Sequence, residues 1–223
     1  MAVFKVVLTA GGTSRRFGGS NKLFENLNGK PVICHSADVF TEMGLEIVIP
    51  VHRDALDDMQ KLFADYKNVK IIEGGITRQQ SVFRGLQELG DCDYAIIHDA
   101  ARPLVTKEII QRGMDAVLEK KAVITAVKTT DTIKKVDINK KIIATPDRTG
   151  LINVQTPQIF DYQMILSCHS KHQDKSMTDD ACLCEASGID VYYTDGDYSN
   201  LKITNKIDIL YAELLIKNQK TGD

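Results

Sequence analysis

Short runs of apolar, β-branched residues alternate along the first half of the chain with segments of helical spacing. Such runs, bounded by turn residues, predict buried strands, and apolar positions three or four residues apart predict amphipathic helices. We expect strands at Phe4–Thr9, Glu46–Val51, Val69–Glu73, Tyr94–His98 and Ala122–Val127. We expect helices at Pro31–Met43, Ala55–Tyr66, Arg78–Leu89 and Lys107–Glu119. This order predicts an α/β fold with a mostly parallel sheet that helices cover on both faces.

The alternation changes in the segment Lys128–Thr149, where polar and apolar residues alternate around an Asp-Ile-Asn-Lys turn. This pattern predicts a β-hairpin. Its outer positions are charged and it has little apolar surface to bury by itself, so it is either a solvated excursion or an arm that packs on another subunit. The pattern leaves both open. Beyond it we expect a helix at Asp179–Ala186, a strand at Asp190–Thr194 and a closing helix at Lys206–Ile216.

Composition and charge narrow the class of protein. The 223 residues are 43% hydrophobic and 26% charged, enough for a sizeable core. A net charge of −2 argues against bulk nucleic-acid binding. No apolar run approaches the roughly 20 residues that span a bilayer, so we expect no membrane partner. The five scattered cysteines lack the paired spacing of a zinc site, and they indicate reduced thiols in a cytoplasmic protein.

The turn after the first strand, AGGTSRRFGGSNK, combines glycines with cations. Gly11 and Gly12 permit close approach of a ligand to the backbone, and successive N–H groups can bind an anion. Arg15, Arg16 and Lys22 add full charges, which suit a polyphosphate. The dinucleotide and Walker A glycine patterns are absent. The turn by itself therefore also fits a flexible basic surface loop.

Two later strands also end in unusual residues. The Gly-Gly pair at 74–75 permits a flat base to approach the backbone, and Thr77 or Ser81 can cap the helix that follows. Asp99 is a carboxylate at the end of a buried strand, which is costly unless it serves a metal, a ribose hydroxyl or an arginine. An ion pair between Asp99 and Arg102 is the simplest structural explanation.

The C-terminal third adds two polar positions. Thr178 opens a helix and is a good N-cap residue. Asn200–Thr204 is interpreted as the end of a strand, with Lys202 pointing away from its apolar face. Solvation at the surface explains Lys202 equally well when it is taken by itself.

These segments taken together are much more specific for one protein family than any single segment is. In order, the chain contains AGGTSRRFGGSNK, GGITRQQSV, IHDAARP, DTIKK, DRTG, QTPQIF, TDDA and NLKIT. Over nearly its whole length it resembles the family of 2-C-methyl-D-erythritol 4-phosphate cytidylyltransferases of the non-mevalonate isoprenoid pathway. The resemblance implies one Rossmann-like nucleotidyltransferase domain over residues 1–223, with 128–149 as a β-arm that embraces the partner of a homodimer. It also implies transfer of CMP from CTP to methylerythritol phosphate, release of pyrophosphate, and a Mg²⁺ or other divalent cofactor.

The resemblance assigns roles residue by residue. The catalytic cations on the phosphates would be Arg16, Lys22 and Lys202. The nucleotide would bind at Ala10, Gly11, Gly12, Gly74, Gly75, Ser81 and Asp99, and Asp99 would also be the metal ligand. The polyol phosphate would bind at Arg102, Thr132, Arg148, Thr178 and Thr204, with Thr132 and Arg148 reached across the dimer interface. His98 is expected to be structural, because an ionised phosphate nucleophile needs no general base.

Departures from the family pattern, and other functions, stay open at this point. Ser14, Phe17, Asn21 and Leu23 stand where the family commonly has glycine, methionine, proline and glutamine. A cytidylyltransferase acting on ribitol 5-phosphate shares the fold, although HDAARP and TDDA favour methylerythritol phosphate. A nucleotide-binding module without catalysis is a further class. A nicotinamide-dependent oxidoreductase is disfavoured, because GxGxxG is absent.

Overall fold

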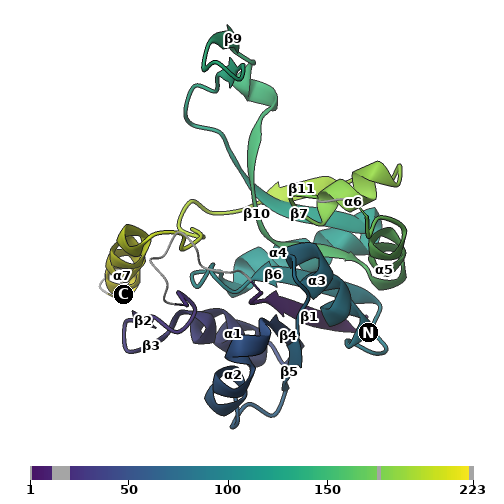
Figure 1. Cartoon of the computed structure of the whole chain (residues 1–223), viewed down its shortest axis with the longest axis vertical. Helices are drawn as coiled ribbons and strands as arrows, with labels where there is room; N and C mark the ends of the chain where they lie inside the picture. Colours follow the sequence, from purple (N-terminus) through teal and green to yellow (C-terminus); the bar gives the residue numbers. More distant parts are fainter. Residues whose placement is uncertain (1, 12–20, 175–176, 221–223) are drawn as a thin grey trace.

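A seven-stranded sheet in the order β11-β7-β10-β6-β1-β4-β5 forms the centre of the protein. The computed structural model describes residues 2–11, 21–174 and 177–220. The strands of this sheet are β1 (Phe4–Thr9), β4 (Glu46–Val51), β5 (Val69–Glu73), β6 (Tyr94–Asp99), β7 (Ala122–Lys128), β10 (Ile152–Asp161) and β11 (Tyr192–Asp195). Every pairing is parallel except the two that β10 makes. The predicted α/β class and the mostly parallel sheet are confirmed (Figure 1).

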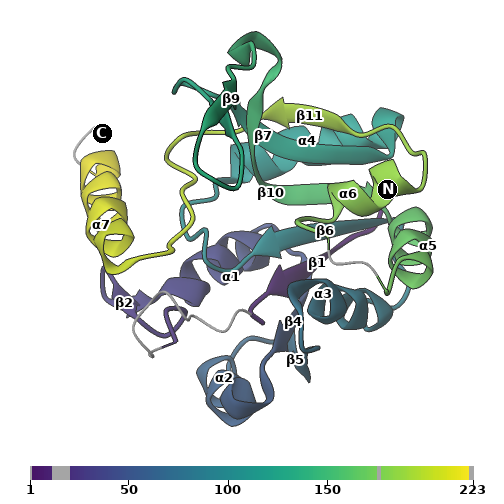
Figure 2. The same cartoon turned by 45° about the horizontal axis from the view of Figure 1, so that its top comes forward.

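Helices cover both faces of the sheet because successive strand residues point to opposite sides. In β1, Val6 and Leu8 are buried in one core cluster and Val7 in the other. The first cluster includes buried residues of α1 (Val32–Glu42), α2 (Leu56–Leu62) and α4 (Lys107–Lys120). The second includes those of α3 (Arg78–Gln87), α5 (Tyr162–Lys171) and α6 (Ala181–Ala186). Figures 1 and 2 show these two helical layers on either side of the strands.

The strand β10 is the main element that the sequence pattern does not predict. It lies between β6 and β7 and is antiparallel to both. Its pairing with β7 is irregular between Gln155 and Gln158, so Pro157 sits where the ladder is interrupted. Proline lacks an N–H and is tolerated in sheets at such bulges, but within an apolar run it argues against a central strand. The helix α5, which follows directly, was not predicted either.

Several smaller elements complete the chain or correct the predictions. The segment Asn200–Thr204 is not a strand. The helix α6 begins at Ala181, so Thr178 is not its N-cap, whereas Thr77 does cap α3 through a capping box with Gln80. The closing helix is α7 (Lys206–Lys220). The remaining elements are β2 (Asn26–Leu27), β3 (Lys30–Pro31) and the 3-10 helices Arg53–Ala55 and Arg148–Gly150.

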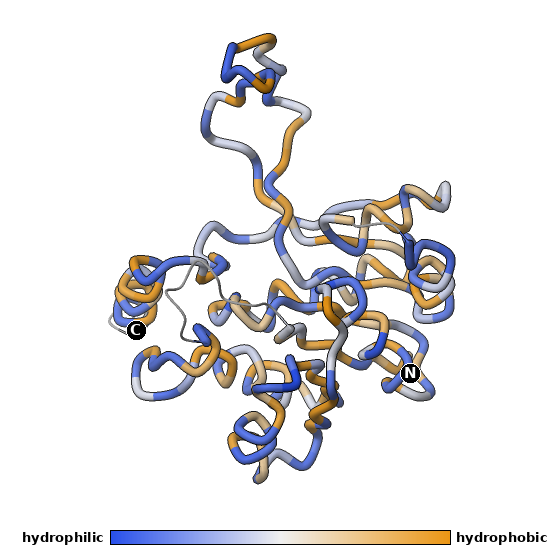
Figure 3. The backbone as a smooth tube through the Cα atoms, viewed as in Figure 1, coloured by the Kyte–Doolittle hydropathy of each residue, from blue (hydrophilic) through white to orange (hydrophobic). Residues whose placement is uncertain are grey.

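The predicted hairpin is present and projects away from the sheet (Figure 1). It contains the two short strands β8 (Lys135–Val136) and β9 (Ile142–Ala144). Its aliphatic residues stay exposed, from 37% at Ile133 to 98% at Ile138. Hydrophobic and hydrophilic positions both occur along it (Figure 3). We call residues 128–149 the β-arm.

None of the helices in the described part of the chain combines the length and the apolar character needed to cross a membrane.

Candidate active site

The site begins where β1 and β6 end side by side. Thr9 pairs in register with Asp99, so the segments that follow both strands leave the sheet at the same edge. The Thr9 hydroxyl donates to Asp99 Oδ1 at 3.1 Å, and Asp99 is only 7% exposed. Ligands of open parallel sheets bind beyond the carboxyl ends of strands. This edge therefore brings Ala10 and Gly11, which follow β1, to the same end of the sheet as the Asp99 carboxylate.

Two cations hold the Asp99 carboxylate. Lys202 Nζ lies 2.6 Å from Oδ2, and Arg78 Nε lies 3.2 Å from Oδ1. Burial would raise the pKa of Asp99, but Arg78 and Lys202 outweigh it and hold this pKa well below its usual range. The alternative explanation, an ion pair between Asp99 and Arg102, does not hold, because the ion-pair partners of Asp99 are Arg78 and Lys202. Arg102 instead donates to the backbone oxygen of Asn200 at 2.7 Å.

Lys22 lies beside the segment that carries Lys202. Its ammonium group donates to the backbone oxygen of Ile203 at 2.7 Å. Lys202 itself is 42% exposed at its side chain, so it is both paired and accessible. The structure thus brings together two of the three predicted catalytic cations, although they are 180 residues apart in the sequence. The third, Arg16, lies outside the described residues.

A cavity of about 370 Å³ opens beside this cluster. Four predicted site residues line it: Asp99, Arg102, Thr178 and Lys202. They come from the end of β6, the loop after β6, the loop before α6 and the segment before α7. Arg78, Thr156 and Gln158 line it as well. The charged side chains around this hollow are three carboxylates, of Asp99, Asp179 and Glu185, and three cations. Among the cations, Arg102 and Lys202 suit a ligand that carries phosphate groups.

The predicted nucleotide-binding glycines meet at the start of α3. A Cβ atom at Gly11 or at Gly74 would lie 2.6 or 2.8 Å from Ser81 Oγ, too close to fit. The Gly75 N–H donates to this same Ser81 oxygen at 3.1 Å. Ala10 precedes Gly11 and bridges to Val51 at the end of β4. Close packing around Ser81 thus explains why glycine stands at these positions. Gly74 is buried there, whereas Gly11 and Gly75 are partly exposed.

Other predicted residues lie elsewhere. Thr204 is next to Lys202, but its N–H donates to Asp208 of α7, and it does not line the cavity. Thr132 and Arg148 are exposed on the β-arm, where Arg148 donates to the backbone oxygen of Thr130. In the described part of this chain, neither residue forms a hydrogen bond or an ion pair with Asp99 or Lys202. Gly12 lies outside the described residues.

Sequence reasoning missed Arg78 and Thr156 as members of the site. Thr156 Oγ accepts the Asp99 N–H at 3.0 Å and contacts His98 Nδ1, also at 3.0 Å. Both missed residues stand inside strings that carry the family resemblance, GGITRQQSV and QTPQIF, which was the available signal. Burial lowers the pKa of His98 to about 4, so the ring is neutral near pH 7. Its contacts run to Thr156 and to the backbone of Arg102, not into the cavity.

The described side chains offer one way to hold a divalent metal. Among them no group of three or more histidine, cysteine or acidic residues could enclose an ion. Mg²⁺, however, is usually held by one or two carboxylates together with substrate phosphates. Asp99 is a carboxylate of that kind at the cavity wall. The residues therefore fit a metal ion whose ligands are the Asp99 carboxylate and, for the most part, phosphate oxygens of the substrates.

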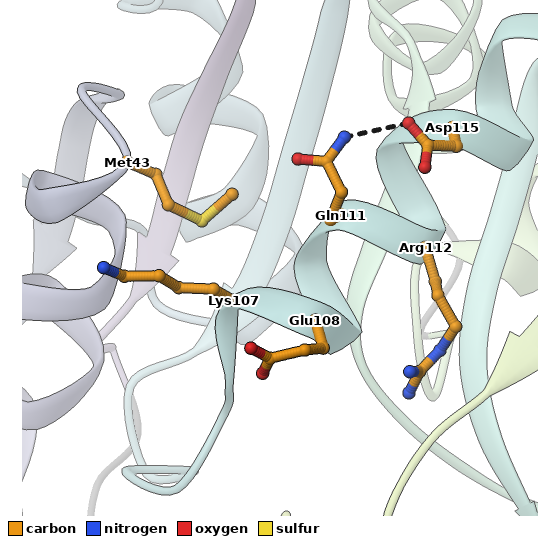
Figure 4. Close-up of a pocket in the computed structure, with 6 residues that line it drawn as sticks. All are labelled: Met43, Lys107, Glu108, Gln111, Arg112 and Asp115. Atoms are coloured by element: carbon orange, nitrogen blue, oxygen red, sulfur yellow. Dashed lines mark hydrogen bonds between the residues drawn. The ribbon is translucent and has the colours of Figure 1, made fainter.

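A second hollow, of about 610 Å³, lies along α4 and away from this cluster (Figure 4). Its polar side chains are satisfied locally. Gln111 donates to Asp115 at 2.8 Å, Lys107 pairs with Glu42 at 2.9 Å, and Arg112 donates to the backbone oxygen of Asp195. Surface ion pairs of this kind are common and do not indicate a ligand site.

Comparison with known proteins agrees with the fold. A profile of the 2-C-methyl-D-erythritol 4-phosphate cytidylyltransferase family matches residues 3–218. The chain belongs to this family. The enzyme of that name from Alkaliphilus oremlandii is 38% identical over 227 residues, covering 97% of this chain and 96% of that protein. A Clostridium perfringens enzyme of the same name is 38% identical over 219 residues, covering 95% and 97%.

Solved structures give the same result. The 4-diphosphocytidyl-2C-methyl-D-erythritol synthase of Anaerococcus prevotii superposes with a TM-score of 0.87 at 30% identity, covering 97% of this chain and 96% of that one. The Thermus thermophilus 2-C-methyl-D-erythritol 4-phosphate cytidylyltransferase gives 0.81 at 25%, covering 97% and 100%. The family resemblance, the predicted fold class and the cytidylyltransferase class of activity are therefore confirmed.

Proposed function

We propose that this protein transfers CMP from CTP to 2-C-methyl-D-erythritol 4-phosphate and releases pyrophosphate, a step in isoprenoid precursor synthesis. The observation that carries the proposal is the cluster of Asp99, Lys202 and Lys22 at the edge of the sheet where β1 and β6 end. Family membership supplies the substrates, and the cluster supplies the charges that two polyanions require.

The chemistry follows from charge and position. A phosphate oxygen of the polyol phosphate attacks the α-phosphorus of CTP, and the bond from that phosphorus to the bridging oxygen breaks in line. The attacking phosphate is already ionised near neutral pH, so no general base is needed. Lys22, Lys202 and Arg16 offset the repulsion between the reactants and stabilise the developing charge. Arg102 and Thr178, on the cavity wall, would hold the polyol phosphate, with Thr204 nearby.

The nucleotide would bind over the first glycine turn. We infer that Ala10, Gly11 and Gly12 lie along it, and that Gly74, Gly75 and Ser81 surround the cytosine. Backbone N–H and C=O groups can recognise a base edge only where no side chain intervenes. The close packing of the glycines on Ser81 supports this placement. A Mg²⁺ ion would be held by Asp99 and the phosphates, and it would neutralise charge on the transferred group.

The β-arm would complete the site from a second copy. We propose that the whole chain, 1–223, acts as one cytidylyltransferase domain, and that residues 128–149 join two copies into a homodimer. Thr132 and Arg148 would then reach the polyol phosphate in the partner's cavity. The β-arm projects away from the sheet that carries the cluster, which supports this arrangement (Figure 1). We also propose a cytoplasmic location, which the five free cysteines support.

One experiment tests the reaction. The protein is incubated with CTP and Mg²⁺ and offered methylerythritol phosphate or ribitol 5-phosphate in separate reactions, and pyrophosphate is measured. We expect release with methylerythritol phosphate and at least tenfold less with ribitol phosphate. Release with ribitol phosphate alone, or with neither, would overturn the proposal. Omitting the metal and adding EDTA should abolish release if Mg²⁺ is required.

A further inference from the structure

Arg78, the first residue of α3, bridges two buried carboxylates. Its Nε donates to Asp99 Oδ1 at 3.2 Å, and its NH1 nitrogen donates to Asp180 Oδ2 at 2.8 Å. Asp180 is 1% exposed and lies directly before α6. Burial would lower the pKa of Arg78, but Asp180 and Asp99 together raise it, so the guanidinium stays charged. Arg78 thus ties the loop before α6 to the end of β6.

The far end of this bridge is fixed as well. Asp180 Oδ1 lies 3.0 Å from His169 Nε2, and the His169 side chain is fully buried. His169 Nδ1 has no hydrogen-bond partner among the described residues, so the ring proton belongs on Nε2, where it is donated to Asp180. Phe83 stacks on the imidazole ring with a centroid distance of 5.9 Å. Asp180 is therefore fixed in position by His169, and its hydrogen bond to Arg78 fixes the guanidinium group in turn.

Lys202 and Arg78 are the two cations in ion pairs with Asp99 among the described residues, and Arg102 adds a positive charge nearby. Asp99 and Asp180 carry two negative charges, and Arg78 and Lys202 carry two positive ones. Lys202 is also the cation proposed to bind substrate phosphate. When it turns to a phosphate, Arg78 stays as an ion-pair partner of Asp99, which matters because an unpaired buried carboxylate is costly.

We propose that Arg78 is a positioning residue for the proposed reaction, on which this inference rests. It keeps Asp99 paired and oriented so that Lys202 is free to bind phosphate. Without Arg78, Lys202 would be the sole ion-pair partner of Asp99 among the described residues. The carboxylate would then hold the lysine more tightly and compete with the substrate for it.

The test measures affinity for inorganic pyrophosphate by calorimetry in wild type, Arg78→Gln, Arg78→Lys, Lys202→Ala and the double variant Arg78→Gln with Lys202→Ala. We expect Arg78→Gln to weaken binding at least fivefold and Arg78→Lys to recover part of the loss, because it keeps the charge without the fork that bridges two carboxylates. In the Lys202→Ala background, Arg78→Gln should change affinity by less than about twofold, since its effect passes through Lys202.

Arg112→Gln is the matched control. Arg112 also donates two hydrogen bonds from a helix to a neighbouring segment, but it lies on α4 away from the cavity. Unchanged affinity in Arg78→Gln would overturn the inference. A fivefold loss of affinity from Arg78→Gln in the Lys202→Ala background would also overturn it. That result would indicate that Arg78 attracts the anion directly or that the variant has lost structure. Turnover with CTP and methylerythritol phosphate is measured separately in wild type, so failure of the proposed function is distinguished from failure of this inference.

Discussion

The β-arm and the cluster around Asp99 differ in how many of their side chains find partners within one chain. In the cluster, Asp99 is 7% exposed and each of its carboxylate oxygens meets a cation from a distant segment. On the β-arm, Ile138 is 98% exposed and Ile142 is 58% exposed. The ladder of the arm consists of a two-residue strand and a three-residue strand.

This difference separates two kinds of site residue. Groups in the cluster are positioned by the core of their own chain, so their geometry is set once the sheet forms. Thr132 and Arg148 stand on a segment with little packing of its own, and an isolated two-stranded hairpin is only marginally stable in water. A function for these residues requires a second surface. Substitutions in the cluster should therefore change activity and leave assembly as it is, whereas substitutions on the β-arm should change assembly and, through it, activity.

The largest effect is expected in the cluster. Lys202→Ala should lower kcat/KM about 100- to 1,000-fold, the usual result of removing one preorganised charge from a transition state. The melting temperature should stay within a few degrees of wild type, because Arg78 continues to pair with Asp99. Lys70→Ala is the control, since Lys70 also pairs with a carboxylate at 2.6 Å but on the far edge of the sheet. Equal turnover in both variants would contradict the role of Lys202.

The second effect concerns the stability of the core. The pKa of His98 is about 4 in the folded protein, and about 6.5 is usual for an unfolded chain. The unfolded state therefore takes up a proton first as the pH falls. The free energy of unfolding should drop by about 3 kcal/mol between pH 7 and pH 4 from this residue alone. Denaturant titrations of wild type and His98→Gln measure it, and the variant should show a shallower fall over that window. If the free energy of unfolding fell equally with pH in wild type and in His98→Gln, His98 would not be buried as a neutral ring.

The third effect tests the β-arm. Ile142→Glu should convert a dimer to monomers in sedimentation experiments, because it places a charge in an apolar contact. Activity should fall about tenfold or more as the partner's groups leave the cavity, at a cost of about 1.4 kcal/mol per tenfold. Leu118→Glu, which changes a comparably exposed residue on α4, should leave both quantities unchanged. A monomeric wild type, or an Ile142→Glu variant that stays dimeric, would remove the basis for the proposed arm interface.

The smallest effect also lies on the β-arm. Asp137 accepts hydrogen bonds from the N–H groups of Asn139 and Lys141, both at 2.9 Å, and so closes the turn at its tip. Asp137→Ala should change the free energy of unfolding by less than about 0.5 kcal/mol, as exposed substitutions away from the core usually do. Chemical denaturation monitored by circular dichroism measures this change. A larger loss would show that the arm and the core unfold as one unit.

The strands β1, β4, β6 and β7 were predictable because their apolar runs are largely buried, and the edge strand β5 was predictable from its β-branched residues although it is only partly buried. β1, β4 and β5 have the predicted bounds, and β6 and β7 each extend one residue further. The strand β10 was not predictable by the same rule. Its Pro157 is tolerated at a bulge that only the pairing with β7 creates, and no local pattern reports a tertiary pairing.

The site was also predictable only in part, because its contacts join residues that are far apart in the sequence. Asp99 could be singled out because a carboxylate at a strand end is unusual, and Lys202 was assigned by family resemblance. Its pairing with Asp99 spans more than one hundred residues, and no spacing rule predicts such a contact. Arg78 was overlooked because a residue near the start of a helix is ordinarily solvated. Only the folded chain shows that two buried carboxylates converge on it.

The central position of β10 sets an order of events during synthesis. β6 and β7 are joined in the sheet only through β10, which is made after both. The four strands β6, β1, β4 and β5 can associate as soon as residue 99 has left the ribosome. β7 must wait until residues 152–161 emerge, with its apolar face uncovered while the β-arm is being translated. A nascent chain stalled before residue 152 should therefore be the stage that most needs a chaperone, and one stalled beyond residue 171 should need it much less.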